Sequence, residues 1–137
     1  MPARSFIDTN VLVYTDDHDH PAKQKRALQL IGDCRRTRTG VLSTQILQEY
    51  FVAATRKLGV AADVARQKAV LFGRLRVVTV GVDDILAAID LHRLHNVSFW
   101  DALVIRAAQA SGCARLYTED LQDSRQFDGL EIVNPFE

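Results

Sequence analysis

The start of the chain decides the fold, and it reads Ser5-Phe6-Ile7-Asp8-Thr9-Asn10-Val11-Leu12-Val13-Tyr14. The run from Ser5 to Ile7 is short, apolar and ends at an acid, which predicts a buried strand. The residues after Asp8 predict a turn into a short helix. Asp8 is therefore expected at the carboxyl end of the first strand.

Strand-like and helical patterns alternate along the rest of the chain. Apolar residues at helical spacing predict helices over about 22–36, 44–58, 61–75, 83–95 and 98–112. Between and after them, buried strands are predicted over 40–43, 77–80, 115–118 and 131–134. This alternation predicts an α/β fold, with a mostly parallel central sheet and helices on both faces.

Length and composition are those of one soluble globular domain. The 137 residues suit a single domain spanning 1–137, and 47% of them are hydrophobic and 25% charged. Seventeen basic residues balance seventeen acidic ones, so the net charge argues neither for nor against a nucleic-acid partner. No stretch is long enough to cross a membrane. Two cysteines, Cys34 and Cys113, without a Cys-x-x-Cys spacing, favour reduced thiols, and we expect a cytoplasmic protein without membrane contact.

Acidic residues follow two of the predicted strands. Asp8 ends the first, and Asp120 comes just after the strand at 115–118, so both are expected at the carboxyl edge of a parallel sheet, where such folds bind ligands. Asp101, in the first turn of the helix from Ser98, lies at the border of its apolar stripe and can face the same crevice. Converging carboxylates repel unless a hard cation lies among them. The pattern therefore indicates an acidic metal site.

Each acid also has an ordinary structural explanation. Asp8 could form a turn or cap the helix that follows it, and Asp120 could be a turn residue. Asp101 completes the capping-box spacing Ser98-x-x-Asp101. Glu49, by periodicity alone, lies on the polar side of its helix and is expected to be solvated. Spacing by itself gives Glu49 no part in a site.

Four segments, taken together, resemble the motifs of PIN-domain proteins. They occur in the right order across nearly the whole chain, and the chain length matches that of VapC-type toxins. One motif alone would be weak, but four in order make a specific match. The segments are Phe6-Ile7-Asp8-Thr9-Asn10, Ser43-Thr44-Gln45-Ile46-Leu47-Gln48-Glu49-Tyr50, Ser98-Phe99-Trp100-Asp101-Ala102-Leu103 and Leu116-Tyr117-Thr118-Glu119-Asp120-Leu121-Gln122.

The resemblance implies a single PIN domain with a metal centre. It implies that Mg²⁺ or Mn²⁺ is coordinated, and an attacking water positioned, by four acids: Asp8, Glu49, Asp101 and Asp120. Asn10 and Thr118 match positions that support the site by hydrogen bonding, although turn chemistry explains them equally well. The implied activity is that of a metal-dependent endoribonuclease leaving a 5′-phosphate and a 3′-hydroxyl.

The resemblance also implies partners. It implies a homodimer and a VapB-type antitoxin, one segment of which, often bearing an arginine, occupies the acidic groove of the toxin. Arg56 shares a helix side with Glu49 and is a candidate contact for an RNA phosphate or for an antitoxin carboxylate. Trp100 is expected to anchor the core.

One departure from the family pattern follows the last motif. Many relatives have glycine after Leu-Gln-Asp or Leu-Gln-His, whereas this chain has Asp123-Ser124. The change affects a turn position and leaves the four acids intact. Asp123 is expected near the metal, but it is given no role as a ligand.

Two other functions compete with the nuclease. A catalytically silent PIN module would bind RNA or protein without cutting. A phosphatase-like hydrolase would use Asp8 as a covalent nucleophile, but it expects a second aspartate two residues on, where this chain has Asn10. Dependence of RNA cleavage on metal separates the nuclease from the binding module, and a trapped phosphoaspartate would identify the phosphatase.

Overall fold

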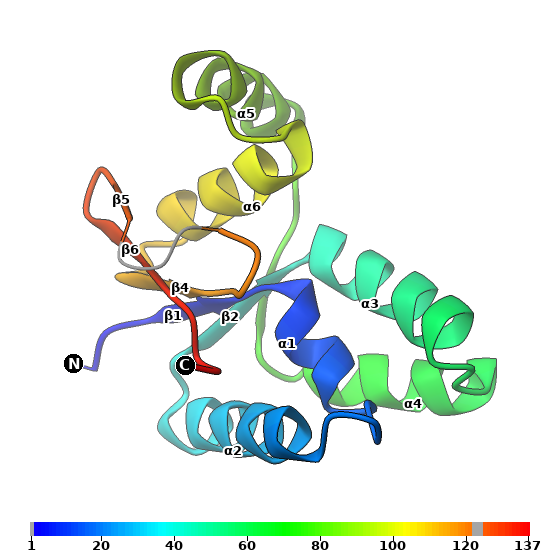
Figure 1. The fold of residues 1–137 in the computed structure, drawn as a ribbon. Helices are drawn as coiled ribbons and strands as arrows, with labels where there is room; N and C mark the ends of the chain where they lie inside the picture. The colour runs from blue at the N-terminus through cyan, green and yellow to red at the C-terminus, as the bar shows by residue number, and fades with distance from the viewer. Residues whose placement is uncertain (1, 122–124) are drawn as a thin grey trace.

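The computed structural model describes residues 2–121 and 125–137 and has the alternating architecture that the sequence predicts (Figure 1). Six strands and six helices are present in these residues. In chain order they are β1 (Ser5–Ile7), α1 (Thr9–Tyr14), α2 (Pro21–Thr37), β2 (Gly40–Ser43), α3 (Thr44–Lys57), α4 (Ala62–Phe72), β3 (Arg76–Val78), α5 (Val82–His95), α6 (Phe99–Ala110), β4 (Arg115–Tyr117), β5 (Gln126–Phe127) and β6 (Leu130–Val133).

The strands form one sheet in the order β3-β2-β1-β4-β6-β5. Every pairing is parallel except that of β5 with β6, which is antiparallel. Because β1 and β4 are neighbours with Ile7 opposite Tyr117, the residues after these two strands lie side by side. The predicted mostly parallel sheet is confirmed, and its topology places Asp8 beside Thr118.

Helices cover both faces of the sheet, as predicted. α5 and α6 lie on one side and α2 on the other, while α3 and α4 extend beyond the carboxyl end of β2 (Figure 1). Strands β1 and β2 are buried along their whole length, as expected for parallel strands covered on both faces, and β4 buries Leu116. The largest fully buried side chains are Tyr50, Phe6, Ile7, Leu12, Leu42, Ile46, Ile105, Leu116, Leu130 and Ile132.

Strand β5 was not among the predicted elements. It pairs with β6 through a two-residue turn, Asp128-Gly129, in which both residues have positive φ, 47° and 87°. Such turns join antiparallel strands because their twist matches that of a hairpin, and Asp-Gly is a strong signal for them. The chain therefore carried the signal, but two strand residues are too few to show a period.

The prediction that Trp100 anchors the core is wrong. Its side chain is 62% exposed and contacts the ring of Phe99 edge-on, with the centroids 5.2 Å apart. The buried residues of α6 begin only at Ala102, so the first turn of the helix projects past the packed layer. An apolar stripe read from spacing cannot show where a helix leaves the core.

A partly buried polar network ties three helices together below the sheet edge. Tyr50 of α3 donates a hydrogen bond of 2.6 Å to Asp16, just after α1, and Lys68 of α4 donates to the other oxygen of Asp16 at 2.7 Å. Lys68 also donates to the hydroxyl of Thr15 at 2.5 Å. Each charge is therefore paired, which a buried ionic group requires. The network fixes α1, which follows Asp8, against α3, which carries Glu49.

Among the described residues, no helix is both long and apolar enough to cross a membrane. Cys34 and Cys113 are free thiols and both are buried.

Candidate metal centre

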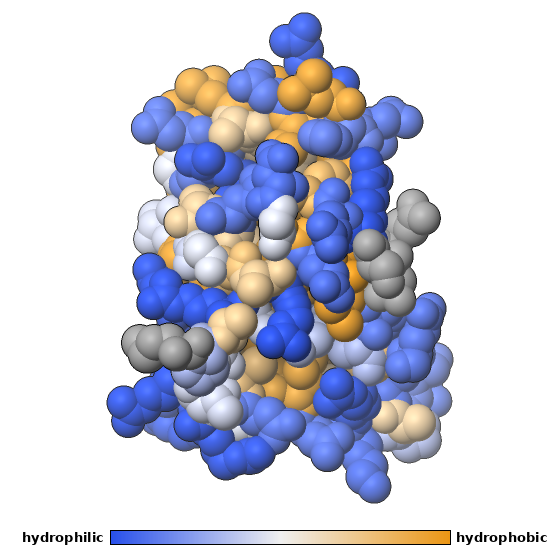
Figure 2. All heavy atoms as spheres, turned by 90° about the vertical axis from the view of Figure 1, so that its left-hand side faces the viewer, coloured by the Kyte–Doolittle hydropathy of each residue, from blue (hydrophilic) through white to orange (hydrophobic). Residues whose placement is uncertain are grey.

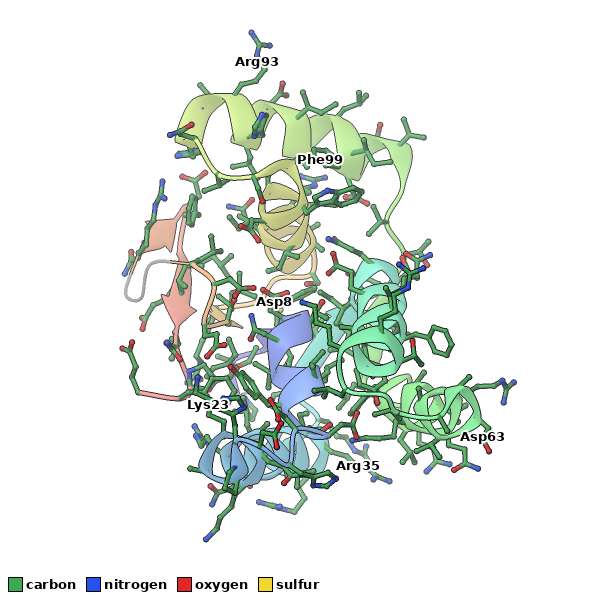
Figure 3. The ribbon with its side chains drawn as sticks, turned by 45° about the vertical axis from the view of Figure 1, so that its right-hand side comes forward. Asp8, Lys23, Arg35, Asp63, Arg93 and Phe99 are labelled. Atoms are coloured by element: carbon green, nitrogen blue, oxygen red, sulfur yellow. The ribbon has the colours of Figure 1, made fainter. Side chains whose placement is uncertain are left out.

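Asp8 lies at the start of α1, between the sheet, α3 and the first turn of α6 (Figure 3). Its backbone amide donates to the carbonyl of Tyr117 at 3.0 Å, which extends the pairing of β1 with β4 by one residue. The side chain is only 5% exposed. The strand pairing therefore delivers a carboxylate into the interior at the edge of the sheet.

Both oxygens of Asp8 accept hydrogen bonds. Oδ1 accepts from the backbone amide of Thr9 at 2.7 Å, so Asp8 also caps α1, as one of its alternative explanations predicted. Oδ2 accepts from the hydroxyl of Thr118 at 2.8 Å. Capping uses one oxygen only, so it does not account for the buried position of the whole carboxylate.

Asn10 joins Asp120 to this group. Its amide nitrogen donates to Oδ2 of Asp120 at 3.0 Å and to the hydroxyl of Thr118 at 3.1 Å. The backbone amide of Asp120 donates to the same hydroxyl at 3.1 Å, which is a local turn contact. Thr118 thus makes both a turn contact and bridging contacts, whereas the contacts of the Asn10 side chain are bridging ones. They link Asp8 and Asp120 through hydrogen bonds.

Glu49 enters the same cluster from α3, and its predicted position on a solvated helix face is wrong. It is partly buried, and Oε1 accepts a hydrogen bond of 2.7 Å from the hydroxyl of Thr9. The amide of Gln45 donates to Oε2 at 3.3 Å. The first turn of α1 covers this side of α3, which the periodicity of α3 alone could not reveal.

Asp101 approaches from α6 and also makes the predicted helix cap. Its backbone amide donates to the hydroxyl of Ser98 at 3.1 Å, which is one half of a capping box. The side chain is half-buried. The carboxylates of Asp101 and Asp120 repel each other, so α6 faces the same region as the end of β4.

Charge repulsion links the four acids in pairs: Asp8 with Asp120 and with Glu49, and Asp101 with Asp120. Burial raises the pKa of Asp8 from 3.8 to about 7; hydrogen bonds from Thr118 and Thr9 oppose the rise, and the charges of Asp120 and Glu49 add to it. Burial also raises the pKa of Asp101, with a further contribution from Asp120. Asp8 therefore has a carboxylate whose negative charge lacks a counter-charge at neutral pH.

The polar atoms around these acids fit a hydrated cation. Three buried side-chain atoms among the described residues have no hydrogen-bond partner, and all three belong to residues at this edge: Oδ1 of Asn10, Oγ of Ser43 and Oε1 of Gln45. Buried orphan acceptors of this kind call for water or an ion. Within the same described residues, no three acidic, histidine or cysteine side chains converge closely enough to hold an ion alone. Mg²⁺ keeps several waters and uses one or two carboxylates directly, so the residues present suit it.

A cleft of about 830 Å³ leads away from the acids along the groove between α1 and α3. Asp120, Glu49 and Asn10 line one end of it. Val13, Val52 and Ala53 line the apolar part, and Arg56 and Lys57 add positive charge from the end of α3. The cleft therefore has an acidic end and basic residues on one wall. Glu49 and Arg56 both line it, as expected for two residues on the same side of one helix.

Glu119 is an acid of the cleft that the sequence did not single out. Tyr14 donates to one of its oxygens at 2.5 Å and Lys23 donates to the other at 3.0 Å, so its charge is already compensated. Thr9 and Gln45, the two donors to Glu49, were also missed. Gln45 lies outside the apolar stripe of its helix by periodicity, on the same polar side as Glu49, so spacing carried no signal for its burial. Asp123 lies outside the described residues.

Comparison with known proteins agrees with this geometry. The sequence profile of the PIN domain family matches residues 5–128. A toxin–antitoxin complex from Klebsiella pneumoniae superimposes with a TM-score of 0.72 at 18% identity, covering 97% of this chain and 98% of that one. VapC20 of Mycobacterium tuberculosis, described as a toxin that cleaves the sarcin–ricin loop, gives 0.62 at 18% identity, with 85% and 89% covered. At this identity the two structures show a shared fold, and no curated protein matches the chain.

Proposed function

This chain belongs to the PIN domain family, and on that premise we propose that it is a metal-dependent endoribonuclease, the toxin of a toxin–antitoxin pair. The observation that carries the proposal is the group of four carboxylates from four separate segments, at one edge of the sheet, with a buried Asp8 whose pKa is raised to about 7. Such an arrangement is costly for folding and is typical of functional sites.

Asp8, Glu49, Asp101 and Asp120 would hold Mg²⁺ or Mn²⁺. The bound ion would polarise a phosphodiester, lower the pKa of a water and neutralise charge that develops during hydrolysis. Thr118 and Thr9 orient Asp8 by donating to its two oxygens, and these hydrogen bonds favour its ionised form against the effect of burial. Asn10 holds Asp120 against Thr118, so the two aspartates keep a fixed separation.

Cleavage of a structured RNA pool tests the proposed function. The purified protein is expected to cut RNA with Mg²⁺ or Mn²⁺, to stop with chelator, and to leave 5′-phosphate ends. Asp120→Asn, purified in parallel, controls for contaminating ribonuclease, because Asp120 is exposed and its amide keeps the contact with Asn10. Binding of RNA with equal background cleavage in both proteins would instead identify the silent PIN module.

The cleft suits both an RNA strand and an antitoxin segment. Arg56 lies two helical turns from Glu49, roughly 10 Å along α3. It would therefore meet a neighbouring phosphate of a bound RNA strand and not the phosphate that is cleaved. An inhibitory polypeptide would need a cation for the acidic end, an apolar middle and a carboxylate for Arg56. An antitoxin segment with an arginine beside apolar residues has that chemistry, which supports a groove shared by the antitoxin and RNA.

Arg56→Gln is expected to weaken RNA binding without impairing the chemical step. The Michaelis constant should rise about fivefold to tenfold, while kcat should stay the same. The slope of log affinity against log salt concentration should become shallower by about one. The matched control is Arg66→Gln, at an exposed position of α4 that does not line the cleft. Equal salt slopes for wild type and Arg56→Gln would show that Arg56 does not contact phosphate.

The outer side of α5 is a candidate surface for the homodimer. Ala88 is the buried residue of this helix, whereas its large apolar side chains are exposed: Val82 70%, Ile85 38%, Leu86 55%, Ile89 39% and Leu94 79%. Apolar side chains gather over this helix at the top of Figure 2. The helix has acids at its start and bases in its last turn, and Arg93 points away from the molecule (Figure 3). Two copies of α5 packed antiparallel would pair these opposite charges.

Leu86→Glu is expected to convert a dimer into a monomer, because it places a charge in the middle of that apolar surface. Sedimentation velocity of wild type and variant measures the change. Lys25→Glu, at an exposed position on α2, is the control and should remain dimeric. A wild type that sediments as a monomer, or a Leu86→Glu variant that stays dimeric, would refute α5 as the interface.

A further inference from the structure

Gln45 occupies an unusual place for a glutamine. It lies in the first turn of α3, one turn before Glu49, and only 6% of its surface is exposed. Its amide nitrogen donates to Oε2 of Glu49 and to the backbone carbonyl of Trp100, both at 3.3 Å. Gln45 therefore contacts two parts of the proposed site. On its own helix it contacts Glu49, and on α6 it contacts Trp100, the residue just before Asp101.

The orientation of this amide is determined by its partners. Both partners are acceptors, a carboxylate and a carbonyl, so the NH₂ group must face them. The carbonyl oxygen of Gln45 then points elsewhere and is one of the buried atoms without a hydrogen-bond partner. Covalent geometry places it roughly 2.2 Å from the amide nitrogen, and so within roughly 5.5 Å of Oε2 of Glu49. A buried acceptor lies beside the acidic cluster with no protein donor.

The amide also bridges two helices that are otherwise separate. Within the described residues α3 and α6 barely contact each other, because each packs on β2 and on its own neighbour, α4 or α5. Glu49 and Asp101 are thus carried by helices whose separation is set mainly through β2 and hardly by direct packing of one helix on the other. The contact from Gln45 to the carbonyl of Trp100 spans that separation at the level of the acids.

We propose that Gln45 is a positioning residue of the metal centre. Its NH₂ group holds Glu49 in place against the first turn of α6, and its buried carbonyl accepts a hydrogen bond from water at the carboxylate edge. The proposal rests on the metal site proposed above and extends it by one residue that no charge or ligand motif marks. Residues that orient ligands in this way commonly change metal affinity by tenfold or more.

Gln45→Met separates positioning from structural support. Methionine has nearly the same shape but no hydrogen-bonding amide, and it removes a buried carbonyl that no protein group satisfies. We expect the dissociation constant for Mn²⁺, measured without RNA, to rise about tenfold. The thermal midpoint of the metal-free protein should be unchanged or higher. In cleavage assays kcat should fall while the Michaelis constant for RNA holds.

Two further variants complete the experiment. Gln67→Met, on the exposed side of α4, should match wild type in affinity and midpoint. Gln45→Asn keeps the amide but is too short to reach both partners, so it should also lose Mn²⁺ affinity. Wild-type affinity in both Gln45 variants, or a lower midpoint with unchanged affinity, would overturn the proposal and leave the metal site standing. Failure of the wild type itself to bind Mn²⁺ would overturn both.

Discussion

Asp8→Asn is expected to stabilise the metal-free protein by about 2 kcal/mol at pH 8. Burial raises the pKa of Asp8 from 3.8 to about 7, so above neutral pH the folded state must hold an unfavourable charge. Each unit of such a shift corresponds to about 1.4 kcal/mol. The full interval would give roughly 4 kcal/mol, and about half of this is offset because the amide loses one of the two hydrogen bonds that the carboxylate accepts.

The sign of the pH dependence follows from the direction of the shift. Between about pH 4 and 7 the folded protein binds a proton at Asp8 that the unfolded chain has released, so stability falls as pH rises. The stabilising contribution is complete below the unfolded pKa and is lost as pH passes the folded pKa. Asp8→Asn removes this dependence. The stability of Asp8→Asn relative to wild type should therefore rise between about pH 4 and 7 and be greatest above pH 7.

Urea unfolding in the presence of chelator, between pH 4 and 8.5, measures this effect. Asp19→Asn, at an exposed position between α1 and α2, is the control and should follow wild type throughout. Asp8→Asn being less stable than wild type at pH 8 would mean that the hydrogen bonds of the carboxylate outweigh its desolvation. A stability–pH slope unchanged by the mutation would mean that Asp8 does not titrate in this range.

The same substitution is expected to abolish RNA cleavage, slowing it on the order of 1,000-fold or more. A bound divalent ion supplies several kcal/mol of charge stabilisation in phosphodiester hydrolysis, and Asp8 is the most buried of its proposed ligands. Because Asp8→Asn should be at least as stable as wild type, the loss would not arise from unfolding. Gain of stability with loss of activity is the result expected when a functional residue is kept at a cost to stability.

Single-turnover cleavage of one RNA identified in the pool measures this loss at saturating Mn²⁺. Asp19→Asn should cut at the wild-type rate. A rate for Asp8→Asn within tenfold of wild type would exclude Asp8 as an essential metal ligand and would favour the silent module. An RNA-dependent phosphoaspartate on Asp8 would favour the phosphatase instead.

The fold could be predicted from the sequence because each central strand is a short apolar run bounded by a helix. The parallel arrangement then follows, and with it the meeting of Asp8 and Asp120 at one edge. Strand β5 was missed because two residues, Gln126 and Phe127, give no periodicity, although Asp128-Gly129 marked the turn. Element ends also shifted: the predicted strand at 77–80 is Arg76–Val78.

The candidate site was less accessible to local patterns. Asp8 and Asp120 follow from strand ends, but Glu49 depends on α1 covering one side of α3, which is a tertiary contact. Periodicity placed Glu49 in solvent, and only the family resemblance included it. Gln45 was missed by both routes, because periodicity placed it on the polar side of its helix and gave no reason to expect a bridge to the carbonyl of Trp100. Contacts between elements distant in sequence are what local spacing omits.

Calorimetric titration of the protein with Mn²⁺ at pH 7, without RNA and in two buffers of different ionisation enthalpy, tests the metal centre most directly. Wild type is expected to bind, and to release roughly half a proton per ion, because ligands must be deprotonated and Asp8 is about half protonated at this pH. Asp8→Asn should bind far more weakly and release no proton. No binding by wild type, or the same affinity and proton release in Asp8→Asn, would contradict the assignment of this carboxylate edge as a metal centre.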